Sequence, residues 1–140
     1  MRDGTLDTLI RLAQVKIDEA RAMVAEKERA IANARAEIDR LTVERATEAA
    51  AAEADETGLA NFPAFLAASR EKEAAVNRSI GELGQELGVA RARLQLAFQE
   101  MKRTEELKRR AAEARLAEAK RRESAELDEI GLARSRRASP

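Results

Sequence analysis

The stretch Asp55-Glu56-Thr57-Gly58-Leu59-Ala60-Asn61-Phe62-Pro63 is the main interior interruption in a 140-residue chain whose remainder has the character of helix. Gly58 suits the left-handed position that closes a helix, Asn61 is a good N-cap, and Pro63 is tolerated in a helix's first turn. We therefore expect a first helix over about residues 5–56, capped by Thr5, and a turn over about 57–61. A second helix should follow over about 62–133, with a frayed tail over 134–140.

The composition also predicts long helices. Ala, Glu, Arg, Leu and Lys make up about 65% of the chain, whereas roughly 50% already suggests a coiled coil or long helix. Half of the apolar residues are alanine. The larger apolar side chains are therefore too few for a thick core and can fill only a narrow seam between helices.

Both expected helices carry a heptad pattern, in which apolar residues alternate at spacings of four and three. In the first helix only Lys27 interrupts the pattern, which runs through Leu6, Ile10, Ala13, Ile17, Ala20, Val24, Lys27, Ile31, Ala34, Ile38 and Leu41. In the second helix the pattern runs through Val76, Ile80, Leu83, Leu87, Ala90, Leu94, Ala97 and Met101. A sustained 3.5-residue period predicts a left-handed supercoil.

The two seams match if the chain folds back on itself near Gly58. In an antiparallel hairpin the numbers of facing residues have a constant sum, and Ile31 with Leu87 and Ile38 with Ile80 both sum to 118. The same rule sets Arg45 opposite Glu73, so that a charge pair replaces an apolar layer. We therefore expect an all-α fold with a single domain over 1–140: a two-helix antiparallel coiled-coil hairpin with a C-terminal helical overhang.

The overhang begins after about residue 115, where the first helix has no residues left to pair with. Residues 1–58 carry a net charge of −4 and residues 59–140 a net charge of +4, so the zero total is a cancellation. The positive excess lies after residue 101. Its basic clusters are either an ordinary solvated face or a surface for an acidic protein partner, and the residues chosen from them as candidates are Lys108, Arg109, Arg110, Arg121 and Arg122.

Two further features can be interpreted in two ways. Phe62, Phe65 and Leu66 either pack the hairpin tip against the alanine-rich end of the first helix or form an exposed apolar contact site. Gly81, Gly84 and Gly88 form a strip without side chains, which is either tolerated local flexibility or a surface that another backbone can approach closely.

Several residue types that metal sites and nucleophilic catalysis require are missing from the sequence. The chain has no Cys, His, Trp or Tyr, so it lacks thiolate and imidazole groups for metal binding or nucleophilic catalysis. We expect no enzyme activity, no metal and no cofactor. The longest apolar run is only five residues, and Met1-Arg2-Asp3 does not begin a signal peptide, so we expect a cytoplasmic protein without membrane insertion. Interleaved acids and the lack of stacking aromatics argue against nucleic acid.

Several motifs resemble the flagellar export protein FliJ family over nearly the whole length of the chain. They are Leu6-x-x-Leu9-x-x-Leu12 followed by Val15-Lys16-Ile17-Asp18-Glu19-Ala20, Asn61-Phe62-x-x-Phe65-Leu66, Lys102-x-x-Glu105-x-Leu107-Lys108-x-Arg110, and Arg122-Glu123-x-x-Glu126-x-Asp128-Glu129. The glycine strip is not part of the family pattern as we know it.

The resemblance implies a stalk-like component of the flagellar type III export apparatus, peripheral to the inner membrane at the flagellar base. Its implied partners are a hexameric export ATPase, the cytoplasmic domain of the export gate, and export chaperones. Phe62, Phe65 and Leu66 would contact the gate, and the basic residues from Lys108 onward would contact the ATPase. The alternatives are a self-assembling structural coiled coil and a stalk protein of a virulence-type secretion system.

Overall fold

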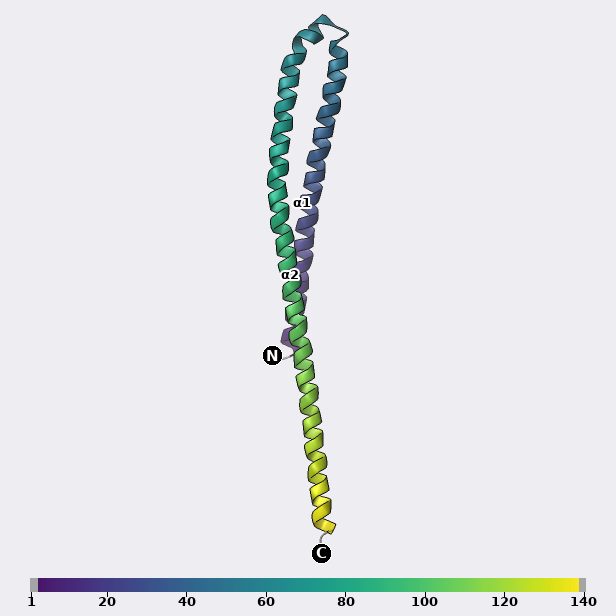
Figure 1. Ribbon diagram of the computed structural model, residues 1–140, viewed down its shortest axis with the longest axis vertical. Coiled ribbons are helices and arrows are strands. Elements are labelled where there is room, and N and C mark those ends of the chain that lie inside the picture. Colours follow the sequence, from purple (N-terminus) through teal and green to yellow (C-terminus); the bar gives the residue numbers. More distant parts are fainter. Residues whose placement is uncertain (1–2, 139–140) are drawn as a thin grey trace. The chain divides into compact units, whose positions relative to one another are not determined.

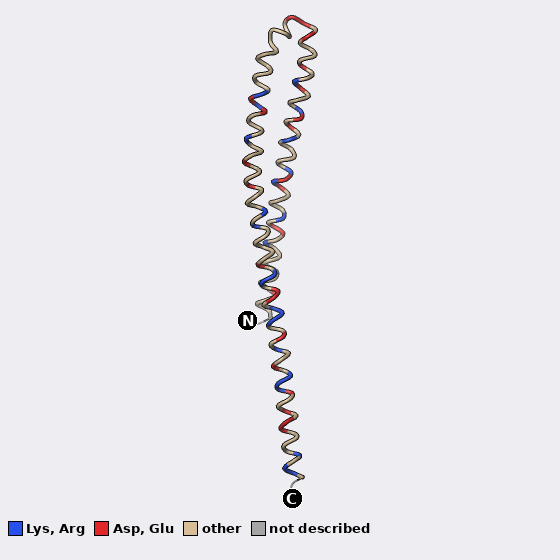
Figure 2. The backbone as a smooth tube through the Cα atoms, viewed as in Figure 1, with Lys and Arg blue, Asp and Glu red and all other residues tan. Residues whose placement is uncertain are grey.

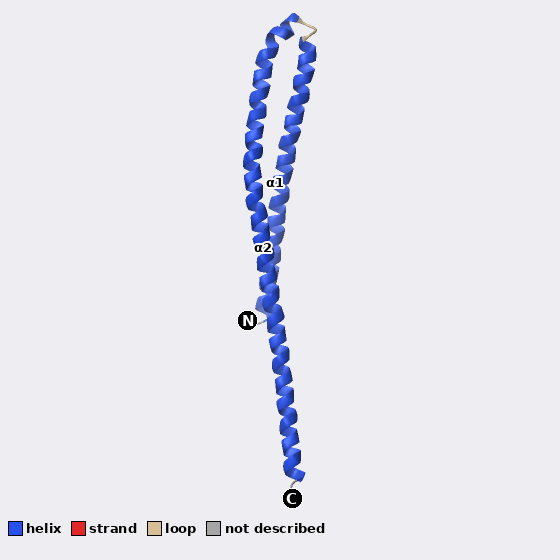
Figure 3. Ribbon diagram, in the orientation of Figure 1, coloured by secondary structure: helices blue, strands red, loops and turns tan. Residues whose placement is uncertain are grey.

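The computed structural model describes residues 3–138, which form two long helices, α1 (Asp3–Ala52) and α2 (Glu56–Ala138). Figure 3 shows that only the short connection between them is not helical in the described part of the chain. The chain divides into two compact units, which we describe separately. The hairpin unit comprises residues 16–96, and the base unit comprises residues 3–15 together with 97–138. The expected all-α hairpin is confirmed.

In the hairpin unit, α1 and α2 run side by side and join through the turn (Figure 1). Each seam position expected in this unit is buried or half-buried, including Lys27. The best-buried α1 side chains are Ile17 and Leu41, at 2% and 1% exposure. On α2 the buried residues of this unit are Ser69, Leu87 and Ala90. A single apolar seam, rather than a thick core, therefore holds the two helices together.

Ion pairs between the helices confirm the antiparallel register. Arg45 Nη2 lies 3.3 Å from Glu73 Oε2, as the constant sum of 118 requires, and Arg45 Nη1 donates a hydrogen bond to Ser69 Oγ at 3.2 Å. Further along, Arg91 Nη2 donates to Glu28 Oε1 at 3.3 Å. Since a slip of either helix would separate these partners, the pairs and the seam specify the same alignment.

The turn lies earlier in the chain than the sequence suggests. α1 ends at Ala52, not near residue 56, and α2 begins at Glu56, not near 62. The tightened bonds from Ala54 N to Ala51 O and from Asp55 N to Ala52 O close α1. Asp55, rather than Asn61, caps α2, because its Oδ1 accepts a hydrogen bond from Thr57 N at 3.1 Å.

Gly58 does not have the role expected of it. Among the described residues no glycine has a positive φ, so Gly58 is not the left-handed terminator of α1. It lies inside α2, where a Cβ atom would come within 3.0 Å of Ala52 Cα. A side chain at this position would therefore be tight against the backbone of α1. Pro63 also lies inside α2 rather than in its first turn, so the amide that would bond the Leu59 carbonyl is missing.

In the base unit, a short part of α1 packs on the C-terminal half of α2. Leu6 and Ala13 are buried on α1, and Ala97 and Met101 are buried on α2. Lys108 Nζ lies 2.7 Å from Asp7 Oδ1. The expected capping role of Thr5 is wrong, since the helix includes Asp3. Thr8 Oγ1 donates to the Gly4 carbonyl at 2.8 Å, as in a continuing helix.

The last part of α2 has no partner helix in the base unit. We call residues 116–138 the overhang; Figure 1 shows it continuing past the start of α1. The helix reaches Ala138, so the frayed tail expected over 134–140 is wrong for residues 134–138. Residues 139–140 lie outside the described residues. Arg136 and Arg137 lie in the last turn, where positive charge interacts favourably with the helix dipole. Gly131 does not end the helix. Neither described helix is apolar over a stretch long enough to span a bilayer.

Candidate partner-binding surfaces

The tip of the hairpin, residues 53–66, brings two of the expected contact residues together. Phe62 and Phe65 stack with ring centroids 6.3 Å apart and planes inclined by 27°. Both rings are half-buried, as is Leu66. Part of each aromatic residue is thus packed within the tip and part is exposed to solvent, so both packing of the tip and contact with a partner remain open to it.

A groove of about 370 Å³ lies beside these rings. Apolar, polar and acidic residues line it: Glu48, Ala51, Ala52, Asp55, Thr57, Gly58, Asn61, Phe62 and Phe65. Leu59 is the most exposed large apolar side chain of the tip, at 54%. Leu59 could not be recognised from the sequence as a surface residue of α2, because the turn was expected over about 57–61.

The five basic candidates all lie in the base unit, and each has an acidic partner. Lys108 pairs with Asp7 of α1, so it also holds the two helices together. Arg109 pairs with Glu106 and Glu113, and Arg110 with Glu106. Arg121 and Arg122 both pair with Glu118. The pairs within α2 join residues one turn apart, the spacing at which opposite charges support a helix.

These ion pairs shift the pKa values of the groups involved. Hydrogen bonding from Arg109 lowers the pKa of Glu106 to about 2, with Arg110 adding to the effect. Lys108 lowers the pKa of Asp7 by donating a hydrogen bond and through its charge. In the hairpin unit, Glu86 raises the pKa of Lys27, because its carboxylate accepts a hydrogen bond from the ammonium and carries the opposite charge. Each shift has charge pairing as its cause, at the edge of the seam for Lys27 and on the base unit for Asp7 and Glu106.

The base unit also concentrates exposed apolar side chains. Among the residues that the structure describes, fourteen large apolar side chains are exposed, and nine of them belong to this unit. On α1 they are Leu9, Leu12 and Val15, and on α2 they are Phe98, Leu107, Leu116, Leu127, Ile130 and Leu132. The leucine spacing of three residues along α1 is the sequence signal for this surface, which was not among the expected binding sites.

Three apolar residues of the overhang share one face of α2, which we call the apolar stripe and which Glu123 interrupts. Because an α-helix turns by about 100° per residue, Leu116, Leu127 and Ile130 fall within a sector of about 60°. Their exposed fractions are 61%, 62% and 50%. Figure 2 shows basic and acidic stretches alternating along the same segment. The overhang thus combines an uncovered apolar stripe with charged flanks, a combination typical of protein-binding helices.

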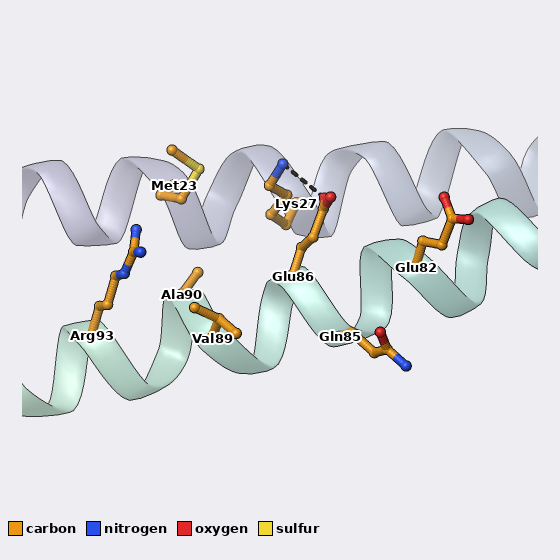
Figure 4. A pocket seen from close by; sticks show the side chains of 8 residues that line it. All are labelled: Met23, Lys27, Glu82, Gln85, Glu86, Val89, Ala90 and Arg93. Atoms are coloured by element: carbon orange, nitrogen blue, oxygen red, sulfur yellow. Dashed lines mark ion pairs between the residues drawn. The ribbon is translucent and has the colours of Figure 1, made fainter.

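A second groove, of about 560 Å³, lies along the middle of the hairpin unit (Figure 4). Lys27 of α1 and Glu86 of α2 form an ion pair across it at 3.0 Å. Met23 and Val89 supply its exposed apolar surface, at 40% and 54% exposure. Within residues 3–138, no group of three or more acidic side chains is arranged to hold a metal ion.

Comparison with known proteins gives one match. Neither the search of curated proteins nor that of solved structures returned a significant match. The family model described as "Flagellar FliJ protein" matches residues 1–139, which is nearly the whole chain. The match agrees with the motifs in both arms and with the helical hairpin observed here. On this evidence, the chain belongs to the flagellar FliJ family of export-associated coiled-coil proteins.

Proposed function

We propose that this protein couples a hexameric flagellar export ATPase to the export gate, without performing covalent chemistry itself. The observation that carries the proposal is the base unit, where an uncovered helix combines an apolar stripe with basic clusters. Nine exposed large apolar side chains would be costly to leave in water unless a partner covers them. Membership in the FliJ family makes export-apparatus proteins the natural partners.

The physical basis of coupling is unequal contact with the subunits of a ring. A two-helix rod presents different side chains in different directions, so it cannot contact six identical subunits identically. Binding that favours one conformation of a subunit shifts that subunit's equilibrium toward it. Contact through the base unit would in this way bias the states of the ATPase, and hydrolysis remains a reaction of the partner.

The ATPase contact is tested by reversing four charges. The variant Arg109→Glu, Arg110→Glu, Arg121→Glu and Arg122→Glu should stimulate the ATPase several-fold less than the wild type does. A matched control, Arg29→Glu, Arg35→Glu, Arg70→Glu and Arg78→Glu, applies the same change of charge to exposed positions of the hairpin unit. Equal stimulation by the first variant and the wild type would contradict the proposal.

Because the charge reversals also break ion pairs within α2, a second variant leaves those pairs intact. Leu116→Ala, Leu127→Ala and Ile130→Ala remove the apolar stripe, and alanine has a high helix propensity. This variant should keep its helicity by circular dichroism and bind the ATPase at least about tenfold more weakly, as expected for loss of interface anchors.

For the gate contact we propose the tip, with Phe62, Phe65 and Leu66 as the contact residues and Leu59 beside them. Replacing Phe62 and Phe65 with alanine should weaken binding to the cytoplasmic domain of the gate. Leu59→Ala should weaken it too and, because Leu59 is already largely exposed, should leave the unfolding midpoint nearly unchanged. The exposed Val43→Ala serves as the control. If the double phenylalanine variant unfolds and Leu59→Ala binds normally, the aromatic pair serves packing alone.

Export chaperones and a position next to the inner membrane at the flagellar base complete the proposal, and both rest on the family. A second candidate is self-association, which the uncovered apolar stripe of the overhang also favours. Sedimentation distinguishes the two, because a hairpin monomer has a mass of 15.4 kDa and a self-assembled coil at least twice that mass.

A further inference from the structure

On α2, the longest stretch of the hairpin unit without a buried residue runs over 70–86. On the side toward the tip, Leu41, Ala52 and Ser69 are buried, and on the other side Ile31 and Leu87 are buried. Between these two groups, residues 32–40 of α1 and 70–86 of α2 contain no buried residue. The seam continues through the stretch, but its members there, Ile38, Ile80 and Leu83 among them, are only half-buried.

The glycine strip, Gly81, Gly84 and Gly88, lies on α2 at the same level. A Cβ atom added at any of the three would meet no atom within 4 Å, so packing does not require glycine there. None of the three has a positive φ, so the backbone conformation does not require it either. The strip differs in this respect from Gly58, where an added Cβ atom would be 3.0 Å from the neighbouring helix. What the strip supplies is backbone freedom, because glycine is the least restrained residue within a helix.

We propose that residues 77–88 form a compliant joint in the hairpin, at which α2 bends and twists more readily than elsewhere in the hairpin unit. Two independent features coincide on α2: residues 70–86 are the longest stretch of the hairpin unit without a buried residue, and three glycines lie within eight residues. On one side of the joint, the Arg45 and Glu73 ion pair holds the register, and on the other side the Arg91 and Glu28 pair does so. The joint therefore lets the tip move without a slip between the helices.

Distance measurement between two labels tests the joint directly. The chain has no cysteine, so the exposed pair Arg70→Cys and Ala92→Cys can carry spin labels on either side of the strip without further changes. A straight helix places these positions about 33 Å apart. The full chain should give a broad distribution that extends below this value. With Gly81→Ala, Gly84→Ala and Gly88→Ala added, the distribution should narrow, and a wild-type distribution that is already as narrow would overturn the proposal.

Amide hydrogen exchange provides a second test that needs no label. Amides of residues 77–88 should exchange faster in the wild type than amides of residues 17–31, and the triple alanine variant should slow them by roughly tenfold or more. Gly131→Ala is the matched control, since it also adds a methyl group to open space on α2 but outside the joint. Exchange over 77–88 that is unchanged by the triple replacement would overturn the proposal.

Discussion

Two kinds of ion pair occur in this chain, and they differ in what they hold together. Arg45 with Glu73 and Lys108 with Asp7 join α1 to α2, whereas Arg109 with Glu106 joins neighbouring turns of one helix. Exposed pairs of the second kind contribute little to stability. Pairs between the helices also help to align α1 with α2, because the two charged residues face each other only in the native register.

The pair between Asp7 and Lys108 should make the base unit sensitive to acid. Lys108 keeps the pKa of Asp7 in the folded chain below its ordinary value of 3.8. A carboxyl group with a lowered folded-state pKa stabilises the fold above its unfolded-state pKa, and this stability is lost as the pH falls through the folded-state value. We therefore expect the thermal midpoint of the wild type to fall as the pH is lowered from about 5 to below 3.

The variant Asp7→Asn isolates this contribution. It should have a lower midpoint than the wild type at neutral pH, and the difference should shrink as the pH falls below about 3. High salt should also reduce the difference, because it screens exposed charges. Asp39→Asn, at an exposed position of the hairpin unit, is the control. A difference between Asp7→Asn and the wild type that is independent of pH would show that the pair does not contribute as described.

At the scale of whole helices, the seam could be predicted from sequence and the helix ends could not. A heptad pattern repeats over many residues, so single exceptions such as Lys27 do not obscure it. A helix end depends on a few residues, and Asp55 and Asn61 are both good caps. In the structure Asp55 is the cap, and Gly58 approaches Ala52 across the turn, a contact between two helices. Local residue preferences do not contain that information.

The turn offers a stability prediction at this scale. Gly58→Val should lower the free energy of unfolding by about 1–3 kcal/mol, because a branched side chain must displace the backbone of α1 at Ala52. Gly131→Val makes the same replacement where nothing lies within 4 Å of the added atom, and it should change stability by less than about 0.5 kcal/mol. Denaturant unfolding of both variants measures this difference. Equal effects would mean that the tip tolerates a side chain at residue 58.

For the molecule as a whole, charge was a better guide to the candidate surfaces than apolar pattern. The excess of positive charge after residue 101 indicated Lys108, Arg109 and Arg110 as candidates, and these residues lie in the base unit. The sequence shows Leu116, Leu127 and Ile130 as separate apolar residues. The structure adds that α1 does not cover them, so all three side chains are exposed. A single sequence shows where apolar residues recur but not which of them remain uncovered.

The central claim is that the base unit binds an export ATPase, and copurification of the ATPase with the intact chain tests it most directly. The tagged full-length chain is expressed in flagellated cells beside a version with Leu116→Ala, Leu127→Ala and Ile130→Ala, and the captured proteins are identified by mass spectrometry. Our account predicts that the wild type retains the hexameric flagellar export ATPase and that the variant loses most of it. Recovery of the ATPase in equal amounts with both chains, or with neither, would contradict the account.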